Sequence, residues 1–149
     1  MARCQVQVGV GVCLLRNNDK QVLMIRHIDD GLWRFPGGGR DPGEALIEVA
    51  SREVLEEVGV DVHPTELSVR HHCFNVFEKY GEWLTFSCYA EVSPSIEPKI
   101  MEPDKHDGLD WFSLEGALCE ELFPPSRLFI EFILEQKKDD APHWAWLHI

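Results

Sequence analysis

The chain has 149 residues, which predicts one domain over residues 1–149 with enough chain to bury a real core. Its hydrophobic fraction of 44% and charged fraction of 27% are ordinary for a soluble globular protein. The 26 acidic residues against 14 basic ones leave a net charge of −12. This charge argues against a nucleic-acid polymer or an anionic membrane as partner, because both attract basic surfaces.

Five cysteines are scattered along the chain without a Cys-x-x-Cys pair, so neither a zinc site nor a redox motif is indicated. Cys13 and Cys88 lie in apolar runs and are expected in the core. The first residues do not resemble a signal peptide, and no apolar run reaches the roughly 18 residues of a membrane span. We therefore expect a reducing, cytoplasmic location.

The first part of the chain predicts two strands joined by a turn. Val6–Leu15 is apolar, residues 17–20 are typical of a turn, and Gln21–His27 completes a hairpin. Arg26 is interpreted either as a surface charge or as a contact to phosphate or base. Trp33 is expected to pack against the sheet, with the wall of a nucleotide pocket as the alternative.

A glycine run and a helix follow. The run Pro36–Gly39 allows backbone atoms to approach a ligand closely. Apolar residues recur at three- and four-residue steps over Leu46–Val54, which predicts an amphipathic helix. The helix should begin near Glu44 or Ala45 and end at Gly59 in a left-handed conformation.

The same helix carries Glu53, Glu56 and Glu57 at positions i, i+3 and i+4, so three carboxylates share one face, while Glu48 points away and is expected in solvent. Such a cluster is usually a solvated surface. Here it lies at the end of the helix where the macrodipole disfavours negative charge. Oxygen ligands beside a glycine backbone suit Mg²⁺ or Mn²⁺, so the pattern favours a metal site.

The second part of the chain predicts another hairpin, formed by Leu67–Phe77 and Trp83–Val92. Thr85 and Ser87 alternate with apolar residues, so their hydroxyl groups are expected to line a pocket. A loop over residues 93–106 is long enough to carry function. Three acids can reach from this part of the chain toward a metal site: Glu102, Asp104 and Asp107.

The C-terminal part predicts a short strand over Gly108–Phe112, a helix capped by Ser113, a break at Phe123–Pro125 and a helix over Ser126–Lys137. The tail Asp139–Ile149 is expected either to fold over the pocket or to lie in a dimer contact. Strands alternating with two helices predict an α/β fold with a mixed sheet between helices.

The segment from Gly38 to Val60 resembles the Nudix box, Gly-x5-Glu-x7-Arg-Glu-U-x-Glu-Glu-x-Gly-U with U bulky and apolar, and every fixed position is filled. Phe35–Gly38 is similar to MutT-type members. Residues 97–105, with Asp110–Trp111 and Leu122–Phe123, are similar to a eukaryotic group of nucleotide diphosphatases. The resemblance implies the Nudix α/β/α sandwich.

The resemblance also implies roles for individual residues. Divalent ions would be held by the Gly38 carbonyl with Glu53, Glu56 and Glu57. Arg52 would pair with a carboxylate and orient it, and Glu44 would cap the helix and counter Arg52. The catalytic set is therefore expected to be Glu53, Glu56 and Arg52, with Glu53 as the general base and Glu102 or Asp104 as the alternative base.

Substrate contacts are expected from six residues: Arg26, Phe35, Gly37, Thr85, Lys105 and Phe123. For Lys105 the resemblance implies a position near a triphosphate, and the alternative is an ordinary surface lysine. Phe123 is the favoured base contact. The chain has Pro124–Pro125 where the eukaryotic group has an aromatic residue, which leaves the preferred base open.

The implied activity is Mg²⁺-dependent hydrolysis of a nucleoside triphosphate, normal or oxidised, to a monophosphate and pyrophosphate, with Mn²⁺ as a substitute cofactor. One alternative is hydrolysis of another diphosphate compound, such as ADP-ribose or an isoprenyl diphosphate. The other is a nucleotide sensor without catalysis, which is disfavoured because all the acids of the box are present. The expected partner is a small nucleotide, and a homodimer is left open.

Overall fold

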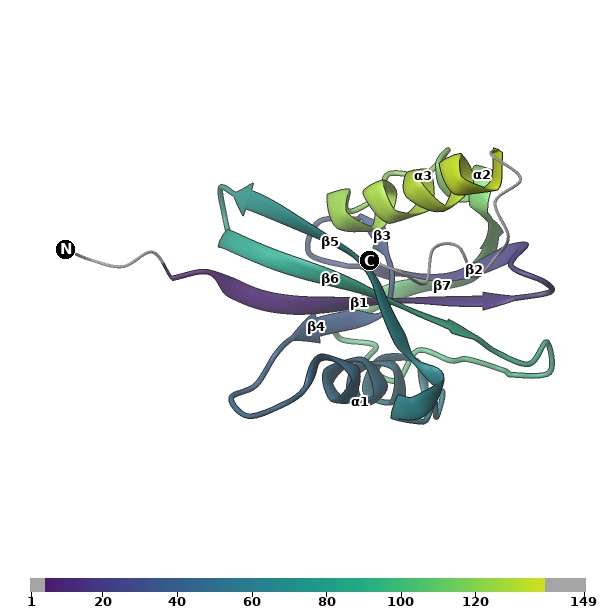
Figure 1. Cartoon of the computed structure of the whole chain (residues 1–149), viewed down its shortest axis with the longest axis horizontal. Helices are drawn as coiled ribbons and strands as arrows, with labels where there is room; N and C mark the ends of the chain where they lie inside the picture. The colour runs from purple at the N-terminus through teal and green to yellow at the C-terminus, as the bar shows by residue number, and fades with distance from the viewer. Residues whose placement is uncertain (1–4, 139–149) are drawn as a thin grey trace.

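The computed structural model describes residues 5–138, which form seven strands, three α-helices and one short 3-10 helix. The elements are β1 (Gln7–Arg16), β2 (Gln21–His27), β3 (Trp33–Arg34), β4 (Gly37–Gly39), α1 (Leu46–Val58), η1 (Pro64–Glu66), β5 (Ser68–Phe77), β6 (Gly81–Glu91), β7 (His106–Ser113), α2 (Leu114–Ala117) and α3 (Pro124–Lys138). Figure 1 shows the sheet between α1 on one face and α2 and α3 on the other, which confirms the predicted α/β/α sandwich.

Strand β1 lies at the centre of a mixed sheet. It runs parallel to β6, and its other neighbours are antiparallel to it. The edge opposite β6 is divided, because Gly9–Gly11 pair with β4 whereas Leu15–Arg16 pair with β2. The predicted first hairpin is therefore paired only next to its turn. The glycine strand β4 takes the other half of this edge, which brings it into the middle of the fold.

The strands β1 and β2 are buried on both faces, so they are apolar along their length instead of alternating with polar residues. Successive side chains point to opposite faces and fill two separate cores. Val12 and Leu14 pack on the side of α1, whereas Cys13 and Leu15 pack with residues of α2 and α3. Cys13 and Cys88 are buried free thiols, as predicted.

Helix α1 begins one residue later than the predicted start, with Ala45 as its N-cap. Glu48 is exposed, as expected, and its carboxylate also accepts a hydrogen bond from the Ala45 N–H at 2.7 Å. Glu44 was expected to cap the helix, but its carboxylate accepts instead from the Asp41 N–H in the preceding turn. Gly59 ends the helix with φ of 67°, which confirms the predicted left-handed cap.

The C-terminal helix α3 begins at Pro124, so the pair Pro124–Pro125 starts this helix and does not break the chain. Proline is tolerated in a first helical turn because the N–H groups there have no partner within the helix. Ser113 caps α2 through a bond from the Gly116 N–H, as predicted. The tail 139–149 lies outside the described residues. Among residues 5–138, no helix is both long and apolar enough to cross a membrane.

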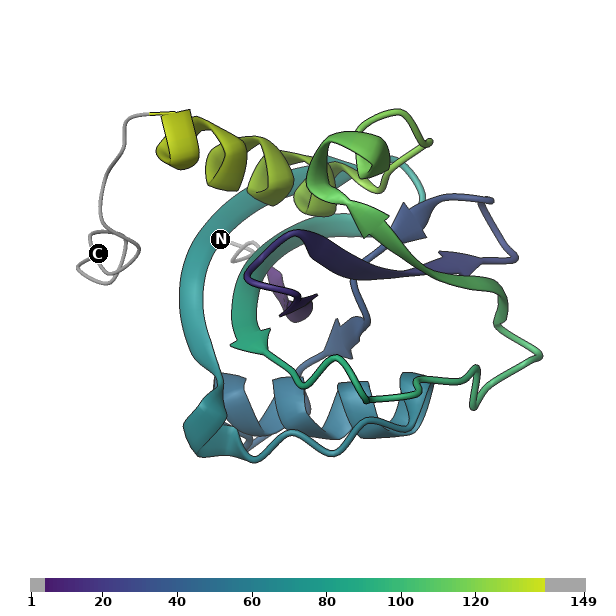
Figure 2. The ribbon, with the colours of Figure 1, turned by 90° about the vertical axis from the view of Figure 1, so that its right-hand side faces the viewer.

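The loop between β6 and β7 runs along α1 (Figure 2). Two backbone hydrogen bonds tie it to the end of this helix, from Lys99 N–H to the Val58 carbonyl and from Met101 N–H to the Glu57 carbonyl, both at 3.0 Å. The loop then enters β7 at His106. This path brings the start of β7 close to the acids of α1.

Candidate active site

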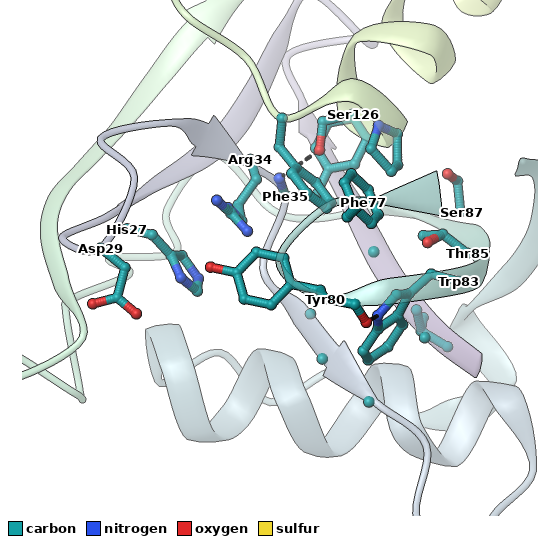
Figure 3. Close-up of a pocket in the computed structure, with 18 residues that line it drawn as sticks. His27, Asp29, Arg34, Phe35, Phe77, Tyr80, Trp83, Thr85, Ser87 and Ser126 are labelled. Atoms are coloured by element: carbon teal, nitrogen blue, oxygen red, sulfur yellow. Dashed lines mark hydrogen bonds between the residues drawn. The ribbon is translucent and has the colours of Figure 1, made fainter. Parts of the chain in front are cut away.

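A cavity of about 320 Å³ opens beside the glycine strand β4 (Figure 3). This volume is at the lower end of the range for small-molecule sites. Five aromatic side chains form much of its wall: Phe35, Phe77, Tyr80, Trp83 and Phe123. Polar side chains come from His27, Asp29, Arg34, Thr85, Ser87 and Ser126. The cavity therefore combines apolar surfaces with a small number of hydrogen-bonding groups.

Two of the aromatic rings are stacked on each other. The rings of Phe77 and Phe123 lie 5.3 Å apart between centroids and 16° from parallel. The guanidinium carbon of Arg34 lies 4.2 Å from the centroid of the Phe123 ring, and Arg34 also forms an ion pair with Asp30. This arrangement gives the cavity flat apolar surfaces beside a fixed positive charge, which suits a planar ring that bears acceptor groups.

The hydroxyl groups lie on two elements. Thr85 and Ser87 of β6 both line the cavity, as their alternation along the strand predicts. Ser126, at the start of α3, is buried, and its Oγ accepts a hydrogen bond from the Phe35 N–H at 3.1 Å. This bond holds the backbone just before β4 against α3.

The glycine strand separates the cavity from the carboxylates of α1. A Cβ atom added to Gly38 would lie 2.5 Å from Cδ and 2.7 Å from Oε2 of Glu53. The N–H of Gly37 donates to Oε2 of Glu57 at 2.8 Å. Gly37, Gly38 and Gly39 also line the cavity. Only glycine lets the carboxylates approach this backbone so closely. The acids and the cavity are therefore separated only by the backbone of β4.

Arg52 connects the carboxylates of the helix. Its guanidinium donates to Glu44 at 2.7 and 3.0 Å, to Glu53 at 2.8 Å and to Glu56 at 3.3 Å. The expected pairing of Arg52 with carboxylates is thus present. Hydrogen bonds from Arg52 and from the Asp41 N–H lower the pKa of Glu44 to about 2, and the bonds to Glu44 and Glu53 raise the pKa of Arg52.

Glu53 is in a different environment, because its side chain is only 13% exposed. Burial raises its pKa, the bond from Arg52 opposes this effect, and the nearby charges of Glu57 and Glu56 add to it. Arg52 is thus shared by Glu44, Glu53 and Glu56, and Glu57 adds a further negative charge that Arg52 does not contact through a hydrogen bond. This excess of negative charge, against a backbone that only glycine permits, fits residues that would hold a divalent cation.

The expected substrate residues fall into two groups. Phe35, Gly37, Thr85 and Phe123 line the cavity, whereas Arg26 and Lys105 are not among its lining residues.

Of the three acids expected to reach toward a metal site, Asp107 and Glu102 form ion pairs with basic residues. Arg26 pairs with Asp107 at 2.7 Å, and Lys105 pairs with Glu102 at 2.6 Å. Asp104 forms no ion pair with any of residues 5–138. Trp33 packs edge-on against Phe112 and is not a lining residue, which agrees with the expected packing role.

Several residues of the site were not predicted. Arg34, Phe77, Tyr80 and Trp83 line the cavity from segments that carry no motif. His27 and His106 lie together with Glu57, and the ligand atoms of all three are within 4.8 Å of one another. The two histidines are 79 residues apart in sequence, so no spacing pattern indicates this contact.

Burial of the His27 ring lowers its pKa to about 4, and the charge of Arg34 adds to this effect. This low pKa favours the neutral imidazole at pH 7.

The chain is similar in sequence and in fold to known proteins. The family model described as the NUDIX domain matches residues 5–132. A crystal structure of a MutT NUDIX hydrolase from Burkholderia pseudomallei has a TM-score of 0.75 and 28% sequence identity, covering 85% of this chain and 97% of that chain.

Two curated relatives are similar in sequence. Nudix hydrolase 6 of Arabidopsis thaliana is 30% identical over 137 residues, covering 86% of this chain and 46% of the relative. Nucleoside triphosphatase NudI of Escherichia coli is 35% identical over 106 residues, covering 61% of this chain and 73% of the relative. The chain thus spans less than half of the Arabidopsis protein and most of the bacterial one.

Proposed function

Because the chain belongs to the Nudix family, we propose that it hydrolyses a nucleoside triphosphate, normal or oxidised, to a nucleoside monophosphate and pyrophosphate. The similarity to a protein named nucleoside triphosphatase supports a triphosphate substrate. The proposed cofactor is Mg²⁺, with Mn²⁺ as a substitute, since members of the family generally use divalent metal ions.

One structural observation carries this proposal. The strand β4 has the carboxylate of Glu53 against Gly38 on one side and the aromatic cavity on the other. A nucleotide whose nucleobase lies in the cavity would direct its phosphates toward the glycine strand and the acids on the other side of it. The distance between the two parts is short enough for one nucleotide to contact both, because Gly38 belongs to both.

The residues proposed to hold the cation are the Gly38 carbonyl, Glu53, Glu56 and Glu57. A divalent ion bound there would neutralise phosphate charge and polarise the phosphoryl oxygens. Hydrolysis of a polyphosphate also needs a water molecule aimed in line with the bond that breaks.

Glu53 is proposed as the base that accepts the proton of this water, since burial makes it more basic than an exposed carboxylate. Arg52 holds Oε1 of Glu53 and so orients the carboxylate. Glu102 or Asp104 of the loop is the alternative base.

The base is proposed to stack in the cavity beside Phe123 and Phe77, with its polar edge toward hydroxyl groups such as that of Thr85. Stacking on aromatic rings tolerates any base and contributes roughly 1–3 kcal/mol. The hydroxyls and Arg34 also argue against an isoprenyl diphosphate, whose apolar chain has no hydrogen-bonding partner for them. Arg26 and Lys105 stay proposed phosphate contacts.

A substrate panel tests the proposal. The purified chain is incubated with Mg²⁺ and nucleoside triphosphates, oxidised purine triphosphates, ADP-ribose and an isoprenyl diphosphate, and pyrophosphate and phosphate are measured separately. We expect pyrophosphate from one or more triphosphates. Release of product only from ADP-ribose or the isoprenyl compound would replace the proposal with the corresponding alternative.

The variant Glu56→Gln provides the matched control for this panel. Glu56 has a side chain that is 54% exposed, and its one ion pair among residues 5–138 is with Arg52 at 3.3 Å, so its replacement should leave the fold intact. Turnover should be lost if the acids hold the cation. Full activity of Glu56→Gln would contradict the assignment, and nucleotide binding without turnover by the unmodified chain would indicate a sensor.

A further inference from the structure

A second cluster of metal-ligating groups lies beside the cavity and shares only Glu57 with the carboxylate set. His106 Nε2 is 3.0 Å from His27 Nε2 and 3.4 Å from Glu57 Oε1. All three ligand atoms are within 4.8 Å of one another. They come from three elements, β2, α1 and β7, so the tertiary structure and not a local motif brings them together.

The distances fit a tetrahedral ion. Zinc lies about 2.0–2.1 Å from imidazole nitrogen and about 2.0–2.2 Å from carboxylate oxygen, so neighbouring ligand atoms in a tetrahedral site are roughly 3.3–3.5 Å apart. Two of the three separations are already near this value. The third separation, between His27 and Glu57, is within 4.8 Å.

The fold holds each of these groups in place. His27 and His106 are paired across β2 and β7 at an irregularity in the register, and such bulges redirect side chains. The Glu57 carboxylate is held at Oε2 by the Gly37 N–H, which leaves Oε1 toward His106. The side chain of His106 is fully buried, and its Nε2 is the atom that lies near both His27 Nε2 and Glu57 Oε1.

We propose that His27, His106 and Glu57 bind a borderline divalent ion such as Zn²⁺ or Co²⁺. Two imidazoles and one carboxylate suit these ions, whereas Mg²⁺ prefers oxygen ligands alone. His27 also lines the cavity, so an ion bound by these residues would lie beside the substrate space. The site shares Glu57 with the proposed Mg²⁺ set, so occupation by Zn²⁺ should inhibit Mg²⁺-dependent turnover.

Cobalt provides a direct test, since tetrahedral Co²⁺ has strong visible absorption bands. The chain is titrated with CoCl₂ in metal-free buffer, and binding is measured by absorbance and by isothermal titration calorimetry. We expect one Co²⁺ with tetrahedral bands, and displacement of this ion by Zn²⁺. Each of His27→Gln and His106→Gln should weaken this binding by at least about tenfold.

The control is His72→Gln, which changes a histidine on β5 outside the cluster and should leave the spectrum unchanged. His106 is buried, so the circular dichroism of His106→Gln is checked first, and His27→Gln decides alone if His106→Gln does not fold. Absence of tetrahedral bands, or equal binding in His27→Gln and the unmodified chain, would overturn the proposal. None of these measurements needs turnover, so they are independent of the proposed hydrolysis.

Discussion

The carboxylate of Glu53 occupies the space that a side chain on Gly38 would need, since a Cβ atom there would lie 2.5 Å from Cδ of Glu53. The close approach of Glu53 is what requires glycine at this position. The backbone conformation does not require it, because Gly38 lies in an ordinary strand paired with Val10. Strand β4 and helix α1 can therefore pack this closely only if residue 38 has no Cβ atom, and a substitution at this position tests the relationship.

Replacement of Gly38 by alanine should separate stability from activity. The Glu53 carboxylate is the end of a flexible side chain and can move, so we expect unfolding to become easier by only about 1–2 kcal/mol. The same movement should lower kcat by roughly 100-fold, because a shift of about 1 Å in a reacting group has this effect. Urea unfolding and steady-state kinetics measure the two quantities.

Gly39→Ala is the matched control for this change. Its Cβ would lie 3.7 Å from the Trp83 ring, which is an ordinary contact. We expect near-normal stability and a much smaller loss of kcat. Similar losses in both variants would show that Glu53 does not depend on the space at Gly38.

The pair of Glu44 and Arg52 should contribute stability that depends on pH. Hydrogen bonds from Arg52 and the backbone lower the pKa of Glu44 in the folded chain to about 2, below its ordinary value of about 4.5. The contribution is therefore complete above about pH 4.5 and is lost as the pH falls toward 2. Glu44→Gln should be less stable than the unmodified chain at pH 6, and this difference should vanish near pH 2.

Urea midpoints at several pH values measure this difference. The control is Glu97→Gln, which changes an exposed carboxylate with no ion pair among the described residues. Its stability difference from the unmodified chain should stay small over the same range. A constant difference for Glu44→Gln would mean that the Glu44 charge does not stabilise the fold.

Loss of the Phe123 ring should weaken substrate binding. If a base stacks beside Phe123, its removal costs roughly 1–3 kcal/mol of binding, so Phe123→Ala should raise KM about tenfold or more. Phe132→Ala is the comparison, since Phe132 stacks on Phe129 and is not a lining residue of the cavity. It should lower stability and leave KM unchanged. Equal KM values in the two variants would remove Phe123 from the base site.

The hydrogen bond between Ser126 and Phe35 should stabilise the folded chain. The Ser126 Oγ accepts from the Phe35 N–H in a buried position, so Ser126→Ala leaves that donor without a partner and should cost about 1–3 kcal/mol. In Ser51→Ala the lost bond runs from the hydroxyl to the Val62 carbonyl in a partly buried position, and the cost should be below about 1 kcal/mol. Thermal and urea unfolding compare the variants, and a smaller loss for Ser126→Ala would contradict this ranking.

Local patterns predicted the parts of the fold that depend on near neighbours in sequence. The three- and four-residue spacing over Leu46–Val54 predicted helix α1, and Gly59 predicted its end. Alternation along β6 predicted that Thr85 and Ser87 share the cavity. The capping role of Glu48 was missed although the signal was local, because Ala45 lacks the side-chain oxygen of a usual N-cap.

Short-range patterns were enough to predict the α/β class and the carboxylate face of α1, since helical and strand periods are set within a few residues. Three contacts could be seen only in the folded chain: Glu53 against Gly38, Arg34 over the ring of Phe123, and His27 beside His106. These contacts join residues on different elements. They depend on the pairing of β4 with β1 and of β7 with β2, which no local period specifies.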